Sequence, residues 1–129
     1  MIRICAALVA LVLAVPAWAE VKVQEVTSAG GINAWLVEDH SIPFTALEIR
    51  FRGGTSLDDA ETRGAVYLMT ALLEEGAGDL DARAYARSVE SLAASFGFSA
   101  SDDAVSISAR FLTENRDEAL TLLHDALHK

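Results

Sequence analysis

The sequence has few of the residues that build several common kinds of site. It contains one cysteine, two prolines and three histidines in 129 residues. The lone cysteine, Cys5, cannot form a disulfide within the chain, so the fold must be held together by its apolar core. A zinc site needs three or four converging His, Cys or carboxylate ligands, and the first two are scarce here.

Basic residues are scarce as well. There are 10 Lys and Arg against 19 Asp and Glu, and the formal net charge is −9. Nucleic acids and anionic membrane surfaces both attract a basic footprint, so this balance argues against either as a partner. The acidity itself identifies no partner, because acidic surfaces mostly serve solubility.

A long apolar run occurs only at the start of the chain. Residues 1–19 combine Arg3 with an apolar run from Ile4 to Val15, and they end in an A-x-A cleavage site at Ala19. The run is shorter than the roughly 20 residues that span a bilayer, which disfavours a membrane anchor. We therefore predict a signal peptide cleaved after Ala19 and a periplasmic or secreted domain over residues 20–129, with no membrane contact after cleavage.

The rest of the chain predicts an α+β domain. Residues 20–31 read as a polar lead-in, and the later patterns follow the order β β α α β β α. The expected strands are residues 32–39, residues 44–54 and a hairpin over residues 96–112, and the expected helices are residues 64–75, 81–97 and 114–129. This order favours a mostly antiparallel sheet covered by helices on one face.

Helix boundaries are predicted from capping residues. Asp79 or Asp81 is expected to cap the second helix, Gly97 to end it, and Thr113 to cap the third. In the third helix an apolar stripe of Leu120, Leu123 and Leu127 is widened by Ala119, Leu122 and Ala126.

Histidines and carboxylates are the candidate chemical groups, and neither predicts a catalytic or metal site. His40 falls in a turn, whereas His124 and His128 share one face of the last helix at i, i+4 spacing. That spacing can hold a metal, but no third ligand is evident, so we favour solvent-facing side chains that complement the helix C-terminus. Four carboxylate pairs lie at loop or element ends, where capping explains them: Asp58 and Asp59, Glu74 and Glu75, Asp79 and Asp81, Asp102 and Asp103. Nothing resembles a G-x-S-x-G nucleophile elbow or a phosphate-binding loop.

Two long strings carry a resemblance to a known family. They are GINAWLVEDHSIPFTALEIRFRGGTSLDDAETRGAVYLMTALLEEGAGDLDARAY and LAASFGFSASDDAVSISARFLTENRDEALTLL. In order and in local pattern they resemble the N-terminal part of a domain of the insulinase/pitrilysin family, the zinc peptidases with an inverted H-x-x-E-H motif. The resemblance covers about residues 30–129 and implies a peptidase-like half-domain, incomplete at its C-terminal side.

The resemblance also implies that the catalytic motif is lost. In active relatives the helix after Gly64 carries His, then Glu three residues on, then His. Those positions here are Tyr67, Thr70 and Ala71, and only Glu74 remains on that face one turn later. We therefore expect no catalytic residue, no catalytic zinc and no cofactor in this chain. The helix can equally be ordinary core, with Tyr67, Leu68, Ala71 and Leu72 as its packing stripe.

Degenerate domains of this family often accompany active ones. The resemblance thus favours a non-catalytic subunit that pairs with an H-x-x-E-H peptidase domain, carries no zinc itself and shapes a chamber for peptide substrates. Two alternatives stay open: a structural assembly protein with no proteolytic role, and a piece of a longer zinc peptidase whose ligands lie beyond Lys129.

Overall fold

The structure, a computed structural model, describes residues 21–129. The signal peptide predicted for residues 1–19 lies outside the described residues, and its cleavage stays a prediction. The chain divides into two compact units, one ending at His40 and the other running from Ser41 to Lys129, and each is described by itself. No helix in residues 21–129 is both long and apolar enough to cross a bilayer.

The first unit contains an antiparallel hairpin of β1 (Val23–Thr27) and β2 (Asn33–Val37). Its turn passes through Gly31, whose φ of +82° favours glycine. The strand predicted over residues 32–39 is confirmed as β2, but the polar lead-in predicted for residues 20–31 is wrong. The segment pairs through its backbone, and the two valines of β1, Val23 and Val26, are three residues apart, so they do not give the period-2 alternation that predicts a strand.

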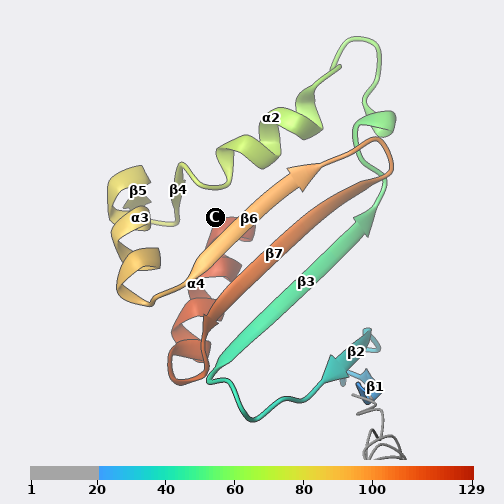
Figure 1. The fold of residues 1–129 in the computed structure, drawn as a ribbon. Helices are drawn as coiled ribbons and strands as arrows, with labels where there is room; N and C mark the ends of the chain where they lie inside the picture. Colours follow the sequence, from blue (N-terminus) through green and yellow to red (C-terminus); the bar gives the residue numbers. More distant parts are fainter. Residues whose placement is uncertain (1–20) are drawn as a thin grey trace, which may run out of the picture. The chain divides into compact units, whose positions relative to one another are not determined.

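The second unit is built on a three-stranded sheet of β3 (Phe44–Arg52), β6 (Ser95–Ala100) and β7 (Ala104–Leu112). The order is β3-β7-β6 and both pairings are antiparallel (Figure 1). Ile107 of β7 lies opposite Ile49 on one side and Phe98 on the other, which places the apolar positions of all three strands on one face. The predicted hairpin turn at residues 101–103 is confirmed.

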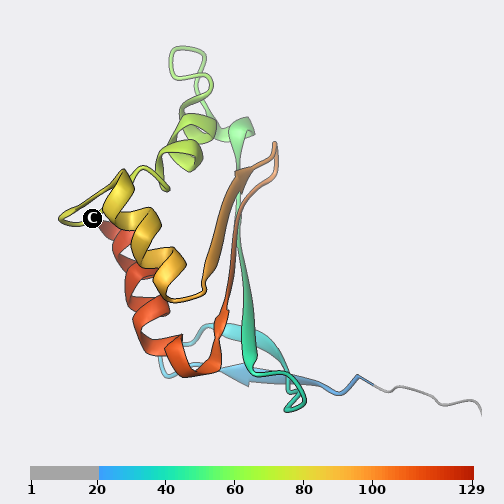
Figure 2. The same ribbon diagram turned by 60° about the vertical axis from the view of Figure 1, so that its left-hand side comes forward.

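Helices α3 (Ala82–Ser91) and α4 (Arg116–His128) cover that apolar face (Figure 2). Phe111 and Ile107 are the largest fully buried side chains. The main cluster comprises Ile107, Ala109, Phe111, Ala119 and Leu123, with Leu47, Ile49, Phe96 and Phe98 among the partly buried residues around it. Burial of this apolar surface is the main source of stability, and the predicted α+β architecture is confirmed.

A short hairpin that the sequence analysis missed precedes α3. Strands β4 (Gly76–Ala77) and β5 (Leu80–Asp81) pair around Gly78, whose φ is +57°. Ala77 then joins Tyr85 of α3 in a second buried cluster with Leu122 and Ala126 of α4. Gly76 and Gly78 make this turn possible, because both have positive φ angles that favour glycine.

The predicted end of α3 is wrong. The helix ends at Ser91, and Gly97, expected as its C-cap, lies inside β6. The left-handed turn is made instead by Ala93, with φ +48°, and its N–H donates to the Glu90 carbonyl at 2.9 Å. Phe96 falls within the helix predicted over residues 81–97, yet its side chain joins the core from β6.

The start of α4 also differs from the prediction. Thr113 opens a short 3-10 turn, Thr113–Asn115, and α4 has no side-chain cap. The Thr113 N–H donates instead to the Pro43 carbonyl at 3.0 Å. The buried stripe of α4 is rotated from the predicted one, since Leu120 is 37 % exposed and the fully covered positions are Ala119, Leu122, Leu123 and Ala126.

Candidate functional site on helix α2

Helix α2 (Ala65–Leu72) is the element on which the resemblance places the three motif positions, Tyr67, Thr70 and Ala71. It starts at Gly64, which has φ +93°, and the Asp58 carboxylate fixes this start. The carboxylate accepts from the Gly64 N–H at 2.7 Å and from the Val66 N–H at 3.3 Å. The capping role expected for the carboxylate pairs is therefore confirmed at Asp58.

The three motif positions of α2 present no metal-binding group. Tyr67 is 66 % exposed, Ala71 is exposed, and Thr70 is 4 % exposed. The Thr70 hydroxyl donates to the Tyr67 carbonyl at 2.8 Å, so it is satisfied within its own helix. A phenol, a hydroxyl that is already bonded and a methyl group cannot reproduce two imidazoles and a general base.

Glu74 does not lie on the helix as predicted, because α2 ends at Leu72 and Glu74 occupies the following turn. Burial raises the pKa of Tyr85 on α3, and the charge of Glu74 raises it further. The Tyr85 hydroxyl is buried and has no hydrogen-bond partner within residues 21–129.

Apolar side chains make up the exposed surface of α2. Tyr67, Leu68, Met69 and Leu72 are between 47 % and 66 % exposed, and Thr70 is the helix's buried residue. We call these four residues the α2 apolar face. The packing stripe considered as an alternative is thus not part of the core of the second unit. An apolar face of this kind marks an interaction surface in soluble proteins.

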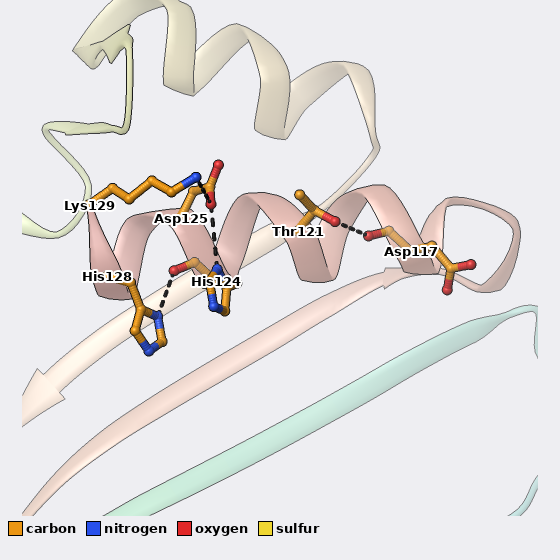
Figure 3. Close-up of polar contacts among 6 residues, drawn as sticks. All are labelled: Asp117, Thr121, His124, Asp125, His128 and Lys129. Carbon is orange, nitrogen blue, oxygen red and sulfur yellow. Dashed lines mark hydrogen bonds and ion pairs between the residues drawn. The ribbon is translucent and has the colours of Figure 1, made fainter.

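The other histidines lie on other elements. His124 and His128 lie on α4 (Figure 3), and His40 ends the first unit, which is described by itself. Across residues 21–129 no three His, Cys, Asp or Glu side chains are grouped so that they could hold a metal ion. Asp102 instead accepts from the Thr55 hydroxyl at 2.9 Å, which ties two loops together.

Sequence reasoning did not find the open groove between α3 and α4. It has a volume of about 420 Å³ and is lined by Ser88, Leu92, Asp117, Glu118, Thr121, Leu122 and Asp125. The lining combines two leucines with three carboxylates. Two helices contribute the lining, so no single stretch of sequence carries its signature.

Comparison with known proteins places this geometry in context. No family model matches the sequence. The chain is 36% identical over 90 residues to the non-peptidase homolog YmxG of Helicobacter pylori, which is 70% of this chain and 21% of the relative.

Solved structures show the same fold. The inactive domain of peptidase M16 from Pseudomonas fluorescens matches 84% of this chain with a TM-score of 0.75 and 33% identity, over 26% of its own length. A protease from Helicobacter pylori matches 83% of this chain at TM-score 0.67 and 17% identity, again over 26% of its length, which bears on the fold alone. The chain therefore spans about a fifth to a quarter of these proteins. It has the fold of an inactive peptidase M16 domain and resembles a homologue that is not a peptidase.

Proposed function

We propose that this chain is a non-catalytic peptidase-like subunit, or a piece of one, which pairs with a zinc-bearing peptidase domain and helps to enclose a peptide chamber. The observation that carries the proposal is the chemistry of α2, where Tyr67, Thr70 and Ala71 stand at the three motif positions. The likeness to a non-peptidase homologue and to an inactive peptidase M16 domain supports it.

The residues at the three motif positions lack the chemical groups that bind zinc and activate its water. Catalytic zinc keeps three protein ligands and an open position for water, and a carboxylate then accepts the proton of that water. The Thr70 hydroxyl is buried and already donates to a carbonyl, so it is no general base. Glu74 is left as a single carboxylate in the turn after α2.

The α2 apolar face supports the pairing part of the proposal. Leu68 is 58 % exposed and Leu72 is 55 % exposed, and both sit on a helix with no charged residue between Ala65 and Leu72. A helix that is apolar nearly all round is normally buried. A second domain that covers this face would remove the unfavourable contact with water and would hold the two domains together.

The test is a pull-down of the chain from extract of its own cell envelope, followed by mass spectrometry. We expect a partner that carries H-x-x-E-H. A Leu68→Gln and Leu72→Gln double variant should lose that partner, whereas Leu120→Gln on α4, also an exposed leucine, should retain it. Retention by the double variant would show that the α2 apolar face is not the pairing surface.

Activity assays separate this function from its rivals. The isolated chain should cleave no peptide, and a chelator-sensitive cleavage by the chain alone would contradict the proposal. Adding the chain should change the partner's rate of peptide cleavage. A partner that binds but cleaves at an unchanged rate would favour a structural assembly role, which the exposed face of α2 also supports.

A further inference from the structure

The three-stranded sheet has a second face, which α3 and α4 do not cover. Side chains alternate along each strand, so the residues between the core positions lie on this side. They include Glu48, Arg50 and Arg52 of β3 and Arg110 of β7. Figure 2 shows α3 and α4 on the other side of the sheet. We call this surface the outer sheet face.

The outer sheet face is positively charged although the chain as a whole is acidic. The basic residues of the three strands are Arg50, Arg52 and Arg110, and all of them are exposed on this face. Glu48 is the one acidic residue of these strands, whereas the formal net charge of the chain is −9. An antiparallel sheet can leave one face in water, but solvation alone does not favour one sign of charge. The excess of arginine therefore indicates a surface that attracts negative groups.

Arg50 and Arg52 are the arginines that are available to a ligand. Within residues 21–129 neither side chain forms an ion pair or a hydrogen bond. The Arg110 guanidinium, in contrast, lies over the Phe44 ring, with Cζ 5.6 Å from the ring centroid. An arginine fork matches the geometry of a carboxylate, so each of the two unpaired guanidinium groups can bind one.

The spacing of Arg50 and Arg52 fits an extended ligand. The two residues are at i and i+2 on one strand, which places them about 7 Å apart along it. Acidic side chains at alternate positions of an extended peptide repeat at the same distance. The rows beside Arg50 and Glu48 hold only small residues across the other two strands: Ser106, Ser99, Ser108 and Gly97. A peptide backbone can therefore approach the sheet next to the arginines.

We propose that the outer sheet face binds an extended acidic segment of a partner protein, with alternate carboxylates on Arg50 and Arg52. Charge complementarity supplies the attraction and the strand spacing selects the pattern. Glu48 lies on the same face two residues before Arg50 and repels a carboxylate there, so it marks one end of the site. The site lies on the sheet and not on α2, and it does not depend on the proposed function.

The test is fluorescence anisotropy of a labelled nine-residue peptide, the length of β3, in which Glu alternates with Ser. It is titrated with the full 129-residue chain. We expect binding that weakens as the salt concentration rises, because exposed charges are screened. The double variant Arg50→Gln with Arg52→Gln should bind about tenfold more weakly, since it removes two charge-assisted contacts.

A matched control separates the site from the net charge of the chain. Arg83→Gln with Arg87→Gln changes the net charge equally, at two exposed arginines of α3, and should bind the peptide as the parent does. Glu48→Gln should strengthen binding about threefold, because it removes the like charge beside Arg50. A variant that merely disturbs the sheet would not bind more tightly.

A peptide with Lys in place of Glu tests the sign of the attraction. It should bind more weakly than the Glu peptide, although an acidic chain attracts basic peptides in general. Stronger binding of the Lys peptide, equal losses in the two double variants, or no binding of the Glu peptide would overturn the proposal. None of these results would bear on whether the α2 apolar face binds a partner.

Discussion

Helices α2 and α4 differ in a way that their compositions do not suggest. Helix α4 has a charged face and buries four residues, whereas α2 has no charged residue and buries only Thr70. The more apolar helix is thus the more exposed one. An apolar stripe is buried only where the fold supplies a surface against it, and within the second unit the sheet supplies that surface to α4.

The sharpest test of this comparison is the same substitution in both helices. Leu123→Ala on α4 removes a side chain that is 3 % exposed, and we expect it to lower the free energy of unfolding by about 2–5 kcal/mol. Leu72→Ala on α2 removes one that is 55 % exposed, and the expected change is within about 0.5 kcal/mol. Urea unfolding followed by circular dichroism measures both.

If Leu72→Ala lowered the free energy of unfolding of the isolated chain as much as Leu123→Ala does, α2 would be packed in solution. The contrast between the two helices would then not hold. Repeating the measurement over a range of protein concentrations distinguishes packing within one chain from association between chains. A loss that grows with concentration indicates that a second copy covers the α2 apolar face.

The sequence was sufficient to predict the parts of the fold that have strict periodicity. Alternation in residues 44–52 and 104–112 predicted the long strands, and the turn at residues 101–103 followed from its polar residues. Asp81 was one of two expected caps, and it accepts from the Ala84 N–H at 2.7 Å. These features depend on local chemistry, which a single stretch of sequence contains.

The sequence-based predictions were wrong where tertiary contacts determine the local structure. Strand β1 is held by backbone pairing with β2, and its two valines do not alternate with period 2. Ala93 takes a left-handed conformation that favours glycine, so nothing in its residue type marks the end of α3. The residue types at Tyr67, Thr70 and Ala71 could be compared with the family motif from the sequence, but the exposure of Tyr67 and the separation of Glu74 from the helix required the structure.

A smaller effect is expected at the start of α3, the helix that packs beside α4. Asp81→Ala removes the side-chain cap and should lower the free energy of unfolding by about 1 kcal/mol. Asp79→Ala is the control, because Asp79 was the rival candidate for the cap and is exposed. Equal losses in the two variants, measured by thermal unfolding, would show that net charge rather than the cap is responsible.

Tyr85 tests how burial and the charge of Glu74 act on a phenol in the second buried cluster. Its buried hydroxyl has no partner in the described part of the chain, so Tyr85→Phe should change stability at pH 7 by no more than about 1 kcal/mol. Burial, and then Glu74, raises the pKa of Tyr85 above its ordinary value of 10.0. The phenol therefore stabilises the fold below pH 10 and loses that contribution as the pH rises through its folded pKa.

Above pH 10 the Tyr85→Phe variant should therefore unfold less readily than the parent chain. Glu74→Gln should lower the pKa of Tyr85, which absorbance of the tyrosinate reports. A parent chain whose Tyr85 titrates at its ordinary value would show that Glu74 and burial do not act on it.

The smallest effect is expected at the end of α4, where exposed charges replace packing. A hydrogen bond from Lys129, and then one from His124, lower the pKa of Asp125 below its ordinary value of 3.8. A depressed pKa contributes stability above pH 3.8, and that contribution disappears as the pH falls through the folded value. Asp125→Asn should therefore be slightly less stable than the parent at about pH 6 and equal to it in strong acid.

Lys129→Gln should reproduce most of the difference in stability, because Lys129 is the larger cause of the lowered pKa of Asp125. A gap between parent and Asp125→Asn that persists unchanged into strong acid would mean that the asparagine perturbs the helix itself, and the charge at this end of α4 would then carry none of its stability.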